Sequence, residues 1–250
     1  MKIGIICLGL ICGSIYRDLK KLNYDVVAVS QSQNGIGIYK DFSILKTCDI
    51  VFVCSPMNKT LQVLDELENV LLPNTIVTDV CSLKQFVSKK KRPYKFIPSH
   101  PMAGTEHQGF ENSMEGLFLG RKWVVTPVWG NDETLISIIE KLGATPVVTT
   151  PEKHDEAVAL ISHMPMLVAQ AIFKTASDNE LALEIASSGF RDMTRLAMSN
   201  VEMANDMILM NSENIQTSVL KLYKSIGDLT NSDYLSQIKE IKLNRQSMFL

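Results

Sequence analysis

The residues best suited to chemistry lie in one polar stretch, SHPMAGT, which covers residues 99–105. Its His100 carries an imidazole with an ordinary pKa of about 6.5, so it can accept or release a proton near neutral pH. Gly104 lets the backbone approach a ligand, and Thr105 offers a hydroxyl. Oxidation of an alcohol by hydride transfer needs a base for the hydroxyl proton, and His100 could be that base. The alternative is a structural histidine in a rigid loop.

Three further side chains could assist such a base. Ser82 follows a predicted strand, where it could hydrogen-bond the imidazole or a substrate hydroxyl, or cap a helix that starts there. Arg191 and Arg195 are four residues apart, and their planar guanidinium groups suit a carboxylate ligand. Neutralisation by neighbouring acids such as Asp192 is the alternative.

The sequence around the other histidines indicates a functional role less strongly. His163 lies in an apolar helical stretch beside Pro165, where it could be a core residue or line a cleft. His107 and His154 have no ligand-like partners in the sequence. We expect no metal site, because no cluster of His, Cys and carboxylates has ligand spacing.

The first 150 residues predict the scaffold for these groups. Short runs that are apolar throughout alternate with helical patterns, which is typical of a doubly wound parallel sheet covered on both faces. Such sheets bind ligands at the carboxyl ends of their strands. Strands are predicted at 2–8, 25–30, 49–54, 75–80, 95–97, 122–126 and 145–148, and 31–40 is expected to be a loop.

From Pro151 onward only helical periodicity is present. We therefore divide the chain into an α/β domain at 1–150 and an all-helical domain at 151–250, packed on the sheet domain or on a second subunit. Helices are predicted at 152–176, 178–187, 201–211, 213–228 and 232–247.

The turn after the first strand indicates a dinucleotide site. Gly9 precedes a helix, at the place where dinucleotide-binding domains cradle a pyrophosphate. Cys7 and Cys12 stand where the pattern GxGxxG has its first and third glycines, so the motif is eroded. An ordinary turn without cofactor is the alternative.

The end of the second strand bears on which cofactor binds. Ser30, Gln31 and Ser32 stand where an NAD-binding domain usually has an acid for the ribose hydroxyls. Hydroxyls and amides can donate to a 2′-phosphate, so we expect NADP, with NAD as the alternative. No arginine is present there to bind that phosphate.

Composition excludes several other classes. A net charge of −2 over 250 residues gives no field that would attract nucleic acid or an anionic membrane. Five cysteines without a CxxC pair are expected to be free thiols in a reducing compartment. The basic run 89–92 is expected to be a solvated turn. The first strand starts at residue 2 or 3, and no apolar run is expected to span a bilayer, so we expect a cytoplasmic protein.

Together these motifs resemble the prephenate/arogenate dehydrogenase family of tyrosine biosynthesis along nearly the whole chain. The most specific are SHPMAGTEHQG at 99–109 and ASSGFRDMTR at 186–195. The others are LGLICGS at 8–14, VFVCSP at 51–56, TDVCSLK at 78–84 and ISHMP at 161–165.

The resemblance implies a Rossmann-type domain followed by a helical dimerisation domain, and hence a homodimer. It implies oxidative decarboxylation of a 4-hydroxycyclohexadiene carboxylate: the ring loses hydride from C4 to nicotinamide, loses carbon dioxide and becomes a phenol. The motifs most resemble the arogenate-using, NADP-linked branch, with prephenate as the alternative substrate. The eroded turn and Gln31, where NADP-using relatives often have Arg, are departures.

The resemblance also assigns residues. It makes His100 the catalytic base, Ser82 its hydrogen-bonding helper and Arg195 the ligand of the substrate carboxylate. The remaining implied substrate contacts are Arg191, His163, Thr105 and Gln108. The implied cofactor contacts are Gly9, Leu10, Ile11, Ser30, Gln31, Ser32, Cys54, Ser55 and Pro56. Two rivals remain: a 3-hydroxyacid type of dehydrogenase, which would need a lysine inside the long helix, and an NADP-binding protein without turnover.

Overall fold

A six-stranded parallel sheet organises the first half of the chain. The computed structural model describes residues 1–105, 107–231 and 233–248. The strand order β3-β2-β1-β4-β5-β6 reverses direction at β1, as in a doubly wound fold. The strands are β1 (Lys2–Ile6), β2 (Asp25–Val29), β3 (Ile38–Tyr39), β4 (Ile50–Val53), β5 (Ile76–Asp79) and β6 (Lys95–Phe96). The short β3 lies in the segment predicted as a loop.

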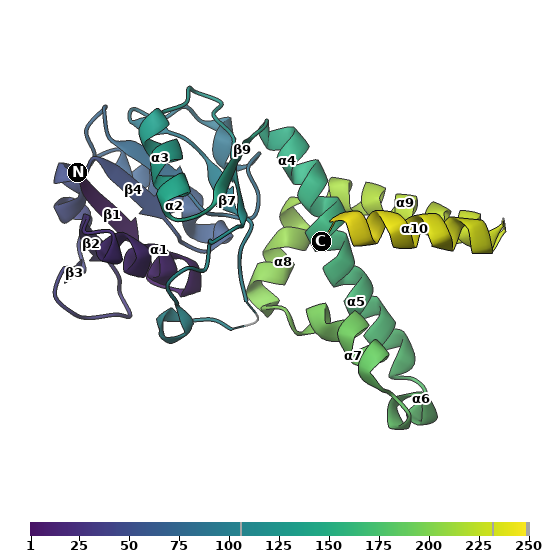
Figure 1. Cartoon of the computed structure of the whole chain (residues 1–250). Helices are drawn as coiled ribbons and strands as arrows, with labels where there is room; N and C mark the ends of the chain where they lie inside the picture. Colours follow the sequence, from purple (N-terminus) through teal and green to yellow (C-terminus); the bar gives the residue numbers. More distant parts are fainter. Residues whose placement is uncertain (106, 232, 249–250) are drawn as a thin grey trace.

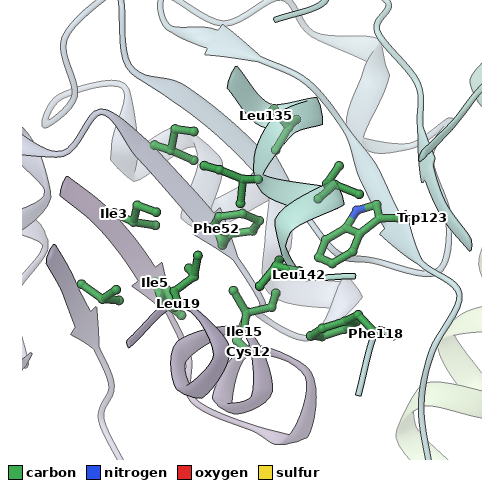
Figure 2. Packing of buried hydrophobic residues seen from close by; sticks show 14 of the residues in the cluster. Ile3, Ile5, Cys12, Ile15, Leu19, Phe52, Phe118, Trp123, Leu135 and Leu142 are labelled. Atoms are coloured by element: carbon green, nitrogen blue, oxygen red, sulfur yellow. The ribbon is translucent and has the colours of Figure 1, made fainter. Parts of the chain in front are cut away.

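Both faces of this sheet are covered, as predicted from strands that are apolar throughout. Helices α1 (Leu10–Lys21) and α3 (Glu133–Lys141) pack on one face, where Figure 2 shows Ile15 and Leu135 around Phe52 of β4. Helix α2 (Met57–Leu67) and the 3-10 turns η1 (Phe42–Thr47) and η2 (Val87–Lys89) cover the other face. No helix starts at Ser82: the segment after β5 is a turn that leads into η2, so that prediction is wrong.

The last two predicted strands, at 122–126 and 145–148, do not extend this sheet. Residue 100 lies in a strand of its own, β7 (Ser99–Pro101), which pairs antiparallel with β8 (Lys122–Val125). Strand β9 (Thr145–Val148) pairs parallel with β8 and completes a separate three-stranded sheet. Trp123 of β8 joins the two sheets, because its ring packs edge-on against Phe52 with centroids 6.4 Å apart (Figure 2). The prediction of one parallel sheet is therefore wrong for this part.

A buried polar cluster fixes where β7 begins. The Lys84 side chain is fully buried, forms an ion pair with Asp79 and donates to the Ser99 carbonyl at 2.6 Å. The Ser99 hydroxyl bonds Thr78 at 2.7 Å and accepts the Trp123 indole N–H at 3.0 Å. These contacts hold the strand that carries His100 against the end of β5.

A long broken helix leads into the second half of the chain, running from the sheet domain across the helical half in Figure 1. It consists of α4 (Pro151–Val158), a π-helical turn η4 (Ala159–His163) and α5 (Met164–Ala176). Pro165 would clash with the carbonyl four residues earlier in a regular helix, and the wider π turn at that place relieves the clash. The predicted helix 152–176 is therefore present, with a π turn around the ISHMP motif.

The rest of the chain is helical, as predicted. Helices α9 and α10 project away from the remainder of the chain in Figure 1. The elements are α6 (Glu180–Glu184), α7 (Ser188–Thr194), the 3-10 turn η5 (Arg195–Met198), α8 (Val201–Met210), α9 (Ser212–Thr230) and α10 (Tyr234–Met248). The projecting helices expose large apolar side chains, among them Leu220, Tyr223, Ile226, Leu235 and Leu243.

Two smaller expectations also need correction. The 26-residue helical run Pro151–Ala176 is long and apolar enough to cross a membrane by length and composition alone, contrary to the expectation that no run is. Core helices of soluble proteins meet the same criterion. In the basic run 89–92, Arg92 is buried and pairs with Asp65 and Glu68, so this turn is not simply solvated.

Candidate active site

His100 ends a chain of three polar side chains. Its Nδ1 lies 2.9 Å from Nε2 of His154, and Nδ1 of His154 lies 2.7 Å from Oδ1 of Asp155. His154 and Asp155 are both buried at the start of the broken helix. The sequence analysis set His154 aside because it has no ligand-like partners in the sequence, and only the fold brings its ring to His100.

This chain of hydrogen bonds fixes the tautomer of His100. A carboxylate only accepts, so Nδ1 of His154 donates to Asp155 and its Nε2 is left to accept. His100 therefore donates through Nδ1, and the lone pair of its Nε2 is free to take a proton from a ligand. Burial, together with the neighbouring His154, Lys84 and His163, holds the pKa of His100 well below its usual range, so the ring is neutral at physiological pH.

Asp155 also ties the helical half to the turn after β5. Its carboxylate oxygens accept the backbone N–H groups of Lys84 and Gln85 at 2.8 and 2.9 Å. Ser82 lies two residues before this anchor and is partly exposed. Its hydroxyl makes no hydrogen bond within the described part of the chain, so the structure does not pair it with His100.

His163 lies in the π turn and is buried close to Asp155 and His154. The Asn211 amide donates to its Nδ1 at 3.2 Å, so the proton resides on Nε2, which has no partner among the residues described. This side chain is both a buried residue and an available donor. Burial lowers its pKa to about 4.

The buried neutral His163 predicts acid sensitivity. The unfolded chain binds a proton at this ring below about pH 6.5, whereas the folded chain does so only near pH 4, so the free energy of unfolding falls as pH drops between those values. The expected loss is about 3 kcal/mol from pH 7 to pH 4. Urea unfolding at both pH values should show a smaller loss in His163→Gln than in the native protein. An equal loss in both would contradict the assignment.

The loop after β7 reaches the helical half. Gln108 accepts a hydrogen bond from the Asn200 side chain at 3.0 Å, which joins the loop to the start of α8. Thr105 is exposed and accepts the backbone N–H of His107 at 3.2 Å. Both predicted substrate contacts therefore lie on a segment that bridges the two halves of the chain.

The two arginines lie at the end of α7 and the start of η5. Arg191 is exposed and lies 3.7 Å from Asp192, whereas Arg195 is exposed with no carboxylate partner among the described residues. Leu196 packs against the same buried cluster as Met102, two residues after His100. The backbone at Arg195 is thus on the His100 side of the helical half, although neither arginine contacts His100.

The turn after β1 has the features of a pyrophosphate cradle. Gly9 is the N-cap of α1, and a Cβ built on it would meet no atom within 4 Å, so the space beside it is open. The first-turn N–H groups, including those of Leu10 and Ile11, have no partners within the helix and favour an anion. Cys7 has φ of 66°, the left-handed region where glycine is normally preferred, which agrees with its place in the eroded motif.

Packing explains why Gly13, in the first turn of α1, is a glycine. A Cβ on Gly13 would lie 2.6 Å from Cβ of Ser113 and 2.7 Å from the Phe110 ring, so only glycine lets that segment pack on α1. Of the strand-end residues, Cys54 and Pro56 flank Ser55, whose hydroxyl is bonded to Thr60 at 2.9 Å. The open space at Gly9 and the free helix N-terminus fit a dinucleotide.

The prediction of five free thiols is wrong for one pair. Cys12 of α1 and Cys54 after β4 form a disulfide across neighbouring elements, with Cα atoms 6.1 Å apart. Their separation of 42 residues hid this proximity in the sequence. Cys7, Cys48 and Cys81 are free. Across residues 1–105, 107–231 and 233–248, no group of three His, Cys, Asp or Glu side chains is placed to hold a metal ion.

Comparison with known protein families decides the relationship. The model of the prephenate dehydrogenase nucleotide-binding domain matches residues 26–148, and that of the prephenate dehydrogenase dimerisation domain matches residues 150–240. The chain belongs to the prephenate dehydrogenase family. The nucleotide-binding match starts after the eroded glycine turn.

Individual members of the family agree with this. The chain is 31% identical to prephenate dehydrogenase of Bacillus subtilis over 235 residues, which is 83% of this chain but 63% of that protein. It thus spans less than two thirds of the length of this relative. Arogenate dehydrogenase of Synechocystis has a similar structure, with 32% identity, a TM-score of 0.81 and coverage of 99% of this chain and 96% of that one. Prephenate dehydrogenase of Aquifex aeolicus, solved with hydroxyphenyl propionate and NAD+, shares the fold with a TM-score of 0.86, 24% identity and coverage of 99% and 98%.

Proposed function

We propose that this member of the prephenate dehydrogenase family is an NADP-dependent arogenate dehydrogenase, which converts L-arogenate to L-tyrosine and carbon dioxide. The observation that carries the proposal is the neutral His100, whose Nε2 lone pair is kept free by the chain through His154 to Asp155. Similarity to the Synechocystis arogenate dehydrogenase over almost the full length of both chains supports arogenate. Prephenate, which would give 4-hydroxyphenylpyruvate, is the alternative supported by the Bacillus subtilis relative.

In the proposed reaction, His100 Nε2 removes the proton of the ring hydroxyl at C4. A nicotinamide held by the glycine turn would supply the acceptor for the hydride of the same carbon. The electron pair of the bond to the leaving carboxylate enters the ring, which becomes aromatic as carbon dioxide departs, and the phenolate oxygen takes the proton back from His100 Nε2. The positive charge that develops on His100 is stabilised through His154 by the Asp155 carboxylate. For Ser82, two residues before the Asp155 anchor, we propose a hydrogen bond to the substrate hydroxyl.

Residues of both halves would hold the two ligands. For the cofactor, we propose Gly9, Leu10 and Ile11 at the pyrophosphate, with Cys54–Pro56 and the turn 30–32 along the rest of the dinucleotide. For the substrate, we propose Arg195 with His163, and with Arg191, Thr105 and Gln108 at the rim. With the domain division at 1–150 and 151–250, we propose that the reaction takes place between the two domains.

We expect Arg195→Gln to weaken substrate binding while leaving cofactor binding unchanged. The guanidinium has no carboxylate partner among the described side chains, so a substrate carboxylate would supply one. Loss of a charge-assisted hydrogen bond costs about 1.5–3 kcal/mol, which corresponds to an increase in KM of roughly tenfold to hundredfold. Initial rates measure this effect, and Arg191→Gln should have a smaller one. An unchanged KM in Arg195→Gln would remove this arginine from the site.

We also propose a cytoplasmic homodimer. The dimerisation-domain match and the apolar side chains exposed along α9 and α10 support it, because a second copy would remove that surface from water. Sedimentation at several concentrations measures the assembly.

Initial rates with arogenate and prephenate, each with NADP+ and NAD+, test the proposed activity. The proposal expects the highest kcat/KM with arogenate and NADP+. A preference for prephenate supports the alternative substrate. Binding of NADP+ without turnover of either acid would support a non-catalytic binding protein, which the eroded glycine turn makes a specific rival.

A further inference from the structure

The turn after β2 is built around one ammonium group. Nζ of Lys40 donates to the carbonyls of Ser30, Gln31 and Gln33 at 2.9, 3.0 and 2.8 Å. The Gln31 amide closes the ring by donating back to the Lys40 carbonyl at 2.9 Å. Lys40, nine residues after Gln31, therefore organises the strand end at which the sequence analysis found no arginine.

This ammonium is not paired with an acid among the residues described. No carboxylate forms an ion pair with Lys40 in the described part of the chain, and the turn it organises contains only serine and glutamine. The hydroxyls of Ser30 and Ser32 lie 3.5 Å apart at the same place. The strand end thus combines one positive charge with two hydroxyl groups and has no acid of its own.

The pairing of β2 with β1 fixes where the turn after β2 lies relative to the glycine turn after β1. β2 pairs with β1 up to Ile6 and Val29, and the Cys7 N–H then donates to the Val29 carbonyl at 2.9 Å. The residues after β2 therefore lie beside the turn that would hold the pyrophosphate. In a doubly wound domain this is where the ribose of the adenosine half is bound.

We propose that Lys40 is the specificity-determining cation of this protein, which selects dinucleotides that carry a 2′-phosphate over those that carry a 2′-hydroxyl. This inference rests on the nicotinamide cofactor of the proposed function. A 2′-phosphate carries between one and two negative charges at neutral pH, so it gains from the uncompensated ammonium, whereas a hydroxyl does not. Because all three ammonium protons point to carbonyls, the phosphate is held by the hydroxyl of the exposed Ser32 and attracted by the charge of Lys40.

A nearby hollow restricts where the phosphate lies. Lys40 and Gln31 line a cavity of about 460 Å³ together with Phe42, and the same cavity also contains the carboxylates of Asp41 and Glu66. Hydrogen bonds from the Ser43 side chain and from its backbone N–H lower the pKa of Asp41 and keep it charged. These acids repel a phosphate, so the phosphate is placed on the Ser30–Gln33 side of Lys40, outside the hollow.

Binding of cofactors to the full chain tests the proposal without any turnover. Isothermal titration gives Kd for NADP+ and NAD+, and for the fragments 2′-AMP and 5′-AMP, which lack nicotinamide. In Lys40→Met we expect Kd for NADP+ and 2′-AMP to rise roughly fivefold to tenfold, because the variant removes a charge that attracts the phosphate without a direct hydrogen bond. Kd for NAD+ and 5′-AMP should change by less than about twofold. Lys46→Met, which removes an exposed lysine of η1, is the matched control and should alter neither.

The ratio of the two affinities separates charge from scaffolding. If Lys40 only holds the turn together, Lys40→Met weakens the binding of NADP+ and of NAD+ equally. An equal loss, or no loss for either cofactor, leaves the ratio of the two Kd values unchanged and overturns the proposal. Lys40→Arg keeps the charge and should keep the preference. These outcomes are independent of the proposed activity: a protein that binds NADP+ through Lys40 yet converts neither ring acid would refute the activity and leave this inference standing.

Discussion

Replacing His100 with Asn is expected to lower kcat by about 10²–10⁴-fold, the range for loss of a positioned base. The amide can still donate to His154, but it has no lone pair of comparable basicity to take the proton of the ring hydroxyl. Hydride transfer from C4 then leaves that proton unremoved. Initial rates with arogenate and NADP+ measure the loss, and NADP+ affinity measured by titration should stay within about twofold of the native value.

A second histidine provides the matched control for this variant. His107 lies on the loop beyond Thr105 and outside the hydrogen-bonded chain. We expect His107→Asn to retain turnover of the same order as the native protein. If His100→Asn turned over at a near-normal rate, the proposed base would be wrong, whatever the fate of the family assignment.

The second large effect is expected from Asp155→Asn, although Asp155 itself would not touch the substrate. With an amide in place of the carboxylate, His154 loses its fixed tautomer, and a fraction of His100 then carries its proton on Nε2, where it cannot act as a base. An aspartate in direct contact with a catalytic histidine contributes up to about 10⁴ in rate. One further imidazole intervenes here, so we expect kcat to fall by about 10–10³-fold.

Asp155 also anchors two backbone N–H groups, so the design must separate positioning from folding. Glu156→Gln makes the same chemical change at the exposed neighbouring residue and should leave kcat unchanged. Urea unfolding reports the stability cost of Asp155→Asn. A positioning role predicts reduced kcat and an acid limb of the kcat/KM profile displaced from that of the native enzyme. Loss of stability with native kcat and an unmoved pH profile would assign Asp155 to the fold alone.

The sequence was a good guide to whatever depends on local pattern. Runs such as DIVFVC predicted buried strands covered on both faces, and the absence of such runs after residue 150 predicted the helices. Specific motifs, above all SHPMAGT, predicted the family. These signals depend on neighbours in the chain, so one sequence is enough to see them.

Features that depend on contacts between distant segments were missed. The hydrogen bond of His100 to His154, the disulfide between Cys12 and Cys54 and the contacts of Lys40 all join residues that carry no shared local pattern. The antiparallel pairing of β7 with β8 was missed because an apolar run does not reveal its direction. The aspartate beside His154 was hidden by the ordinary charged appearance of EKHDE at the start of a helix.

The π turn around Ala159–His163 makes the length of this helix matter more than its composition. Each residue of a regular helix advances the side chains by about 100°. Deleting one residue there would straighten the turn and rotate everything beyond it by that angle, from the Pro165 ring to the aromatic stack of Phe173 on Phe190. Substitutions along Met164–Ala176 should thus be tolerated far more often than insertions or deletions. Natural variants of this helix should keep its length and register while their amino-acid identities change.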